Sequence, residues 1–142
     1  MKKSIFVNLP VKDLAAATRF YEAIGCKKND QFSDDKAASM VWSDTITFQL
    51  LAREYFATFT PKPVADVRNS CAVLLALPLE TRALVDTFAD AADAAGGHAD
   101  VRDRMDLGWL YNRAVEDPDG HLLEALWMDS SGMAESDTVP RG

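Results

Sequence analysis

The sequence has 142 residues, of which 48% are hydrophobic and 26% charged, a composition typical of a globular domain with a sizeable core. The formal net charge of −7 argues against nucleic acid as a partner, because phosphates are bound by clusters of Lys and Arg. No apolar run has the length of a membrane span, and the first residues do not form a signal-peptide pattern. We therefore expect a cytoplasmic protein with no membrane partner.

The first half of the chain predicts a strand, a helix and three further strands. Residues 4–11 alternate apolar side chains on one face with Phe6 and Asn8 on the other, which is the pattern of a strand. Asp13 is a good N-cap for the helix that follows, where apolar residues recur at helical spacing, and Gly25 ends it. The remaining strands are expected over residues 26–32, 37–42 and 45–51, with a short helix over residues 53–59.

The second half predicts the same order of elements. An apolar run over residues 71–77 indicates a strand, and residues 80–95 have helical spacing up to Gly96-Gly97. A strand over residues 98–102 follows. The turn Asp117-Pro118-Asp119-Gly120 then joins two runs rich in β-forming residues into a hairpin.

The two halves therefore read as copies of one supersecondary unit. Leu9-Pro10-Val11 before the first helix parallels Leu77-Pro78-Leu79 before the second, and Gly25 parallels Gly96. We predict an α+β fold with two tandem βαβββ units in a single domain, 1–142. The expected parts are unit one (about 4–60), a linker (about 61–69), unit two (about 70–129) and a flexible tail (130–142).

Glu124 is the residue in the hairpin that most needs an explanation. Its strand is apolar on both faces, so its carboxylate points into apolar surroundings and requires a partner. If the hairpin loop is the two-residue Pro118-Asp119, Arg113 lies opposite Glu124 and shares its face. The same register places Tyr111 opposite Leu126 and Trp109 opposite Met128.

The predicted Arg113–Glu124 pair has two interpretations. It is either a structural ion pair, or an anchor in which Arg113 binds an anionic or carbonyl group of a ligand while Glu124 orients the ligand or accepts a proton. Tyr111 and Trp109 have two interpretations as well, since they either stack on a flat ligand or pack in the core.

Three stretches resemble the vicinal oxygen chelate superfamily, which contains glyoxalase I, bleomycin-resistance proteins and extradiol dioxygenases. They are Asn8-Leu9-Pro10-Val11-Lys12-Asp13-Leu14, Arg19-Phe20-Tyr21-Glu22-Ala23-Ile24-Gly25, and Glu116-Asp117-Pro118-Asp119-Gly120-His121 with Glu124. The resemblance covers about residues 4–129 and is closest to a bacterial glyoxalase-like branch, often described as predicted lactoylglutathione lyases. It implies curved mixed sheets around a cavity, and commonly a homodimer, which we also expect here.

The resemblance also implies where a metal would bind. The family's ligand positions fall on Phe6, Gln49, Leu74 and Glu124, of which only Glu124 is a strong ligand type. We therefore expect no cofactor and no glyoxalase-type metal. The alternative is a divalent metal held by Glu124 and Gln49.

Three functions remain open from the sequence. The first is a protein that binds a small organic ligand in an apolar cavity, with Asn8, Gln49, Arg113 and Glu124 as its polar groups. Phe6 and Leu74 are expected to face the same cavity and to contact the ligand. An alternative is a metal-dependent lyase, similar to lactoylglutathione lyase, or a dioxygenase, in which Glu124 moves a proton. The second alternative is a structural or interaction role, with the cavity collapsed around the ion pair.

Overall fold

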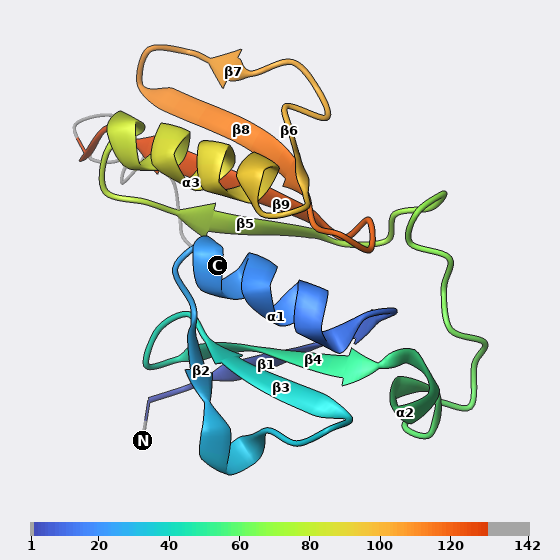
Figure 1. Ribbon diagram of the computed structural model, residues 1–142. Helices are drawn as coiled ribbons and strands as arrows, with labels where there is room; N and C mark the ends of the chain where they lie inside the picture. The colour runs from blue at the N-terminus through green and yellow to red at the C-terminus, as the bar shows by residue number, and fades with distance from the viewer. Residues whose placement is uncertain (1, 131–142) are drawn as a thin grey trace.

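The computed structural model describes residues 2–130, which form two mixed sheets with helices packed against them (Figure 1). The first sheet has the strand order β1-β4-β3-β2, and the second has the order β5-β9-β8-β6, with β7 also paired to β8. In each sheet the first strand of the unit runs parallel to the last, and the other pairs are antiparallel. The predicted α+β fold class is confirmed. The predicted tail lies, from residue 131 onward, outside the described residues.

Unit one follows the predicted order closely. The Asp13 side chain accepts a hydrogen bond from the N–H of Ala16 at 3.0 Å and so caps the first helix, and Gly25 follows that helix at φ +119°. The predicted strand over residues 26–32 is shorter and continues as a turn of 3₁₀ helix. The elements are β1 (Ile5–Val11), α1 (Leu14–Ala23), β2 (Lys27–Asn29), η1 (Asp30–Phe32), β3 (Ala37–Val41), β4 (Ile46–Ala52) and α2 (Arg53–Ala57).

Unit two differs from the prediction in its edge strand. Of the single strand expected over residues 98–102, only 98–99 is formed. A second short strand follows at 105–106, and Asp100 between the two has a positive φ of 54°. Both short strands pair with β8, so the edge of the second sheet is interrupted. The elements are β5 (Leu74–Pro78), α3 (Arg82–Ala94), β6 (His98–Ala99), β7 (Met105–Asp106), β8 (Leu110–Glu116) and β9 (Leu122–Met128).

The two units pack together through their helical sides. α1 lies between the two sheets (Figure 1), and the rings of Trp42 and Phe88 meet edge to face across the boundary at 5.9 Å. Gly97 lies so close to the ring of Phe20 and to the carbonyl of Glu116 that a methyl group would not fit there. The core is continuous across both units, so they form one packed body.

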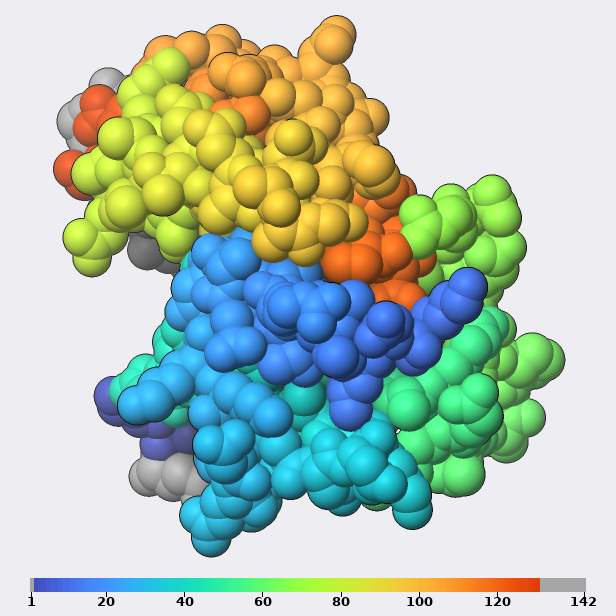
Figure 2. Space-filling view, in the orientation of Figure 1, coloured from blue at the N-terminus to red at the C-terminus, as the bar shows by residue number. Residues whose placement is uncertain are grey.

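The hairpin turn from Asp117 to His121, which we call the Asp117 turn, fastens unit two to unit one. Asp117 is fully buried, and its Oδ2 accepts a hydrogen bond from the Tyr21 hydroxyl at 2.8 Å. The His121 ring lies 2.9 Å from the carbonyl oxygen of Pro10, and the Asp119 carboxylate accepts from the N–H of Lys12 at 2.8 Å. Figure 2 shows this turn (orange-red) against α1 (blue) and the linker (green).

The Asp117 turn also sets the register of the hairpin. Asp117 and His121 close the turn, which leaves the three residues Pro118–Gly120 in the loop, and Gly120 has φ +108°. The predicted pairing assumed a two-residue loop, and that assumption is wrong by one residue. Side chains alternate between the two faces of a sheet. A shift of one residue in the pairing therefore places residues that were predicted to share a face on opposite faces.

The predicted pairs across the hairpin are therefore also wrong. Arg113 lies opposite Ala125, and Glu124 lies opposite Ala114. Tyr111 is opposite Trp127, and Met128 is opposite Leu110 and not Trp109. Arg113 and Glu124 point to opposite faces of the second sheet.

No helix formed by residues 2–130 is both long enough and apolar enough to cross a membrane.

Candidate functional site

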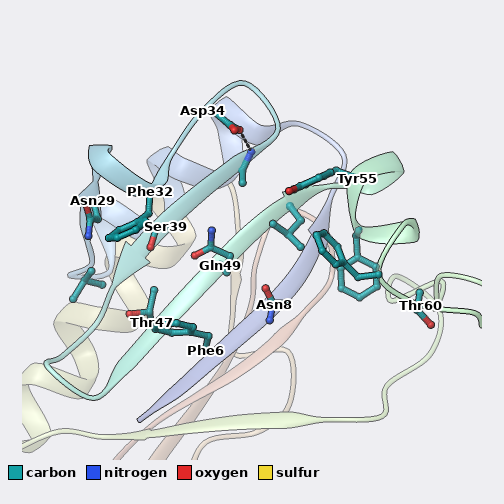
Figure 3. Close-up of a pocket in the computed structure, with 15 residues that line it drawn as sticks. Phe6, Asn8, Asn29, Phe32, Asp34, Ser39, Thr47, Gln49, Tyr55 and Thr60 are labelled. Atoms are coloured by element: carbon teal, nitrogen blue, oxygen red, sulfur yellow. Dashed lines mark hydrogen bonds between the residues drawn. The ribbon is translucent and has the colours of Figure 1, made fainter. Parts of the chain in front are cut away.

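A cavity of about 880 Å³ lies on the face of the first sheet opposite α1 (Figure 3). Its floor is formed by β1, β3 and β4, and its walls by η1, α2 and the segment after α2. All of its lining comes from unit one: Phe6, Asn8, Asn29, Phe32, Asp34, Ala37, Ser39, Val41, Thr47, Gln49, Leu51, Tyr55, Phe56, Phe59 and Thr60. The volume is in the range of small-molecule sites.

The floor carries a pair of side-chain amides. Asn8 and Gln49 are direct neighbours across β1 and β4, and both point into the cavity because alternate residues of a strand share a face (Figure 3). Neither amide makes a hydrogen bond to a protein group in the described part of the chain. Buried Ser39 and Thr47 lie beside Gln49 and Phe6 on the same floor. The cavity therefore presents donors and acceptors that the protein itself does not use.

Aromatic rings line much of the cavity. Phe6, Phe32 and Phe59 are 68%, 63% and 65% exposed, and all three face this one cavity. Tyr55 and Phe59 meet edge to face, with ring centroids 5.0 Å apart. Rings gathered in this way around one hollow are typical of a binding surface for an apolar or flat partner.

The cavity lining contains no Lys or Arg. Its one charged residue is Asp34, whose carboxylate accepts hydrogen bonds from the N–H groups of Lys36 and Ala37 at 2.8 and 3.0 Å. The Lys36 ammonium lies 5.9 Å from the Tyr55 ring centroid, outside the lining. Arg53 in α2 donates to the carbonyls of residues 64 and 65 in the linker. The surface offered to a ligand is therefore aromatic and amide-rich, and its only charge is negative.

The structure brings together only some of the residues predicted for the site. Phe6, Asn8 and Gln49 line the cavity together, as expected from their alternation in β1 and β4. Leu74 lies on β5 in the other sheet and is 57% exposed. Trp109 is 47% exposed just before β8 and does not line the cavity.

Arg113 and Tyr111 lie on the helical face of the second sheet, away from the cavity. Arg113 is 3% exposed and binds Asp86 at 3.0 Å and Asp100 at 2.8 Å, and the Tyr111 hydroxyl donates to Asp86 at 2.7 Å. The Tyr111 hydrogen bond lowers the pKa of Asp86, and the Arg113 guanidinium lowers the pKa of Asp100. The donors of Arg113 are thus engaged within unit two, which supports its structural interpretation.

The cation beside Glu124 is Arg102, which the sequence analysis did not identify. Its Nη2 lies 2.6 Å from Glu124 Oε2 and 2.6 Å from Asn112 Oδ1. Arg102 stands between β6 and β7, so it reaches Glu124 across the intervening strand β8. The signal in the sequence was an Arg in the expected edge strand, but its partner depends on the register of the whole sheet.

The metal that the resemblance implies does not fit the residues present. Phe6 and Leu74 have no donor atoms, Gln49 is a neutral amide, and Glu124 is already neutralised by Arg102. Among residues 2–130 no cluster of three or more His, Cys, Asp or Glu side chains is placed to hold an ion. Divalent sites in proteins are built from several carboxylate, imidazole or thiolate ligands, and this set does not supply them.

Several aromatic residues of the cavity were not assigned to the site from the sequence. Tyr55, Phe56 and Phe59 were predicted to lie on a short helix, but nothing local indicated which face of the sheet that helix would flank. The available signal was the density of aromatic residues directly after β4.

Solved structures with the same fold include proteins of several named kinds. A glyoxalase-related enzyme from Fulvimarina pelagi matches with a TM-score of 0.74 and 21% identity, over 89% of this chain and 88% of that chain. A hypothetical protein from S. aureus matches with a TM-score of 0.73 and 26% identity, over 89% and 94%. The bleomycin resistance determinant encoded on the transposon Tn5 matches with a TM-score of 0.57 and 20% identity, over 89% and 98%. No protein-family model and no curated protein sequence matches the chain.

These similarities define the class of fold. The chain has the fold of the glyoxalase, bleomycin-resistance and dioxygenase proteins, and the predicted resemblance to the vicinal oxygen chelate superfamily is confirmed at that level. Proteins with this fold have different chemistries, so the function has to be argued from the site.

A pair of double-mutant cycles tests the corrected partner of Glu124. Arg102→Met and Glu124→Gln should show a coupling of about 1 kcal/mol in the free energy of unfolding, because the two side chains form a partly shielded ion pair. The effects of Arg113→Met and Glu124→Gln on the free energy of unfolding should add to within about 0.5 kcal/mol, because the two side chains lie on opposite faces of the sheet. Urea denaturation measures both. Coupling in the Arg113 cycle and additivity in the Arg102 cycle would contradict the register described here.

Proposed function

We propose that the protein binds a small organic ligand in the cavity of the first sheet and that it does so without a glyoxalase-type metal. The observation that carries the proposal is the amide pair of Asn8 and Gln49, which faces an open cavity and has no protein partner among the described residues. A few polar groups without protein partners beside an aromatic wall are the usual composition of a small-molecule site.

The two alternatives have less support. A metal-dependent lyase or dioxygenase needs a set of metal ligands, and the implied positions hold Phe6, Leu74, Gln49 and an already paired Glu124. A structural role with a collapsed cavity is disfavoured by the roughly 880 Å³ of open volume over the first sheet. The names of the structural neighbours, which include enzymes and a resistance determinant, are compatible with the binding proposal.

The proposal extends to a homodimer. β1 and β5 stand at the edges of their sheets, and among the described strands each pairs on one side only. Both edges carry exposed apolar side chains, namely Ile5 and Phe6 on β1, and Leu74 on β5 with Val73 just before it. Unpaired apolar edges are templates for association. A twofold axis that pairs β1 of one copy with β5 of its partner would pair the β1 and β5 edges of both chains at once.

The binding proposal is tested with Nile red, an uncharged, flat fluorescent probe. Phe59→Ala should weaken its binding about tenfold in a fluorescence titration, because one stacking ring is lost. Trp109→Ala is the matched control, since it removes an exposed aromatic side chain outside the cavity and should leave the affinity unchanged. Equal affinities for the two variants, or no binding by the wild type, would contradict the proposal. So would formation of lactoylglutathione from glutathione and methylglyoxal faster than the uncatalysed reaction.

The dimer is tested by light scattering coupled to size-exclusion chromatography. The wild type should have twice the mass of the chain, and Leu74→Glu should have the mass of one chain, because it places a charge on the apolar edge of β5. Leu84→Glu is the control, since Leu84 is similarly exposed but lies on α3. A wild-type mass of one chain would refute the dimer.

A further inference from the structure

The amide pair on the cavity floor has a recognisable hydrogen-bonding pattern. A side-chain amide offers one carbonyl acceptor and two N–H donors side by side, and Asn8 and Gln49 sit on neighbouring strands about 4.8 Å apart. Such an amide pairs in two-pronged fashion with the edge of a ring that carries a donor next to an acceptor, as Asn and Gln do with adenine. The floor therefore matches the edge of a planar polar ring, and the aromatic walls match its faces.

The charges around the cavity restrict the ligand further. An anion entering it would lose hydration and meet no Lys or Arg in the lining, and Asp34 would repel it. The nearby Arg53 donates to linker carbonyls, and the Lys36 ammonium, which is not part of the lining, lies over the Tyr55 ring at 5.9 Å from its centroid. A cation would meet several aromatic faces and one carboxylate, which is a favourable environment for it.

From these observations we infer that the ligand is a flat ring system, uncharged or cationic, with a hydrogen-bond donor and acceptor adjacent on one edge, and that the site rejects anionic analogues. This inference rests on the proposed function and names the class of ligand for that same cavity. A tripeptide thiol conjugate such as a glutathione adduct, with its two carboxylates, does not match this site.

Three probes that share the quinoline ring system test the inference. They are quinoline-3-carboxamide, its N-methylated cation and quinoline-3-carboxylate. Titration calorimetry at neutral pH should give affinities for the carboxamide and the cation at least tenfold above that for the carboxylate. A carboxylate that binds as tightly as the carboxamide would overturn the inference and leave the proposed function standing. If none of the three probes binds and Nile red does not bind either, both this inference and the proposed function would fail.

A charge substitution on the floor provides the second arm. Gln49→Lys should reverse the order of the three affinities, so that the carboxylate binds most tightly, because the cavity then contains a cation facing the ligand. Gln31→Lys is the matched control, since Gln31 is an exposed glutamine on η1 outside the lining, and it should leave the order as in the wild type. Asn8→Lys repeats the test at an exposed floor position in case Gln49→Lys folds poorly. An order unchanged in well-folded Gln49→Lys and Asn8→Lys would contradict the assignment of the binding site to this floor.

Discussion

The buried carboxylate of Asp117 is the interaction on which most of the structure depends. Its Oδ1 accepts hydrogen bonds from the backbone N–H groups of residues 119, 120 and 121, each at 2.9 Å, and its Oδ2 accepts from Tyr21. Burial raises the pKa of Asp117, while the Tyr21 hydroxyl and the backbone donors act in the opposite direction. One side chain thus shapes the turn of unit two and joins it to the first helix of unit one. Losing it would leave several buried donors without acceptors, each costing about 1–3 kcal/mol.

The shape of that turn decides the chemistry of the second sheet. A loop of three residues places Arg113 under α3, among Asp86 and Asp100, and leaves Glu124 on the opposite face with Arg102. Each charged group is thereby neutralised by a different partner. The charged groups of Arg113 and Glu124 on the second sheet are therefore already paired within the protein, whereas the two amides on the floor of the first sheet have no protein partner among the described residues. This contrast between the two units is the reason for placing the ligand on the first sheet.

The sequence predicted the features that depend on local patterns. Alternation in β1 and β4 correctly put Phe6, Asn8 and Gln49 on one face, and Asp13 and Gly25 marked the ends of the first helix. The hairpin register could not be obtained in the same way, because Asp-Pro-Asp-Gly is compatible with loops of two or three residues. In the structure the three-residue loop is held by the Asp117 hydrogen bonds to residues 119–121 and also by the contacts of Asp117 and His121 with unit one, and these latter contacts are long-range in sequence.

The partner of Glu124 and the aromatic walls were missed for a related reason. Arg102 reaches Glu124 from the segment between β6 and β7, where the edge strand is interrupted, and Tyr55 lines the cavity from α2. Both depend on tertiary packing, which residue periodicity does not encode. Residues around a site are therefore predicted less completely than the strands that carry it.

We propose that ligand recognition in this protein depends on neutral amides and aromatic rings and not on a metal. Elemental analysis of protein purified without chelators tests this most directly, with Glu124→Gln as the comparison. We expect no stoichiometric transition metal in either protein, because Glu124 is held by Arg102 and the other implied positions lack ligand groups. About one nickel, zinc, manganese or iron ion per chain, lost in Glu124→Gln, would contradict metal-free binding and identify Glu124 as a metal ligand.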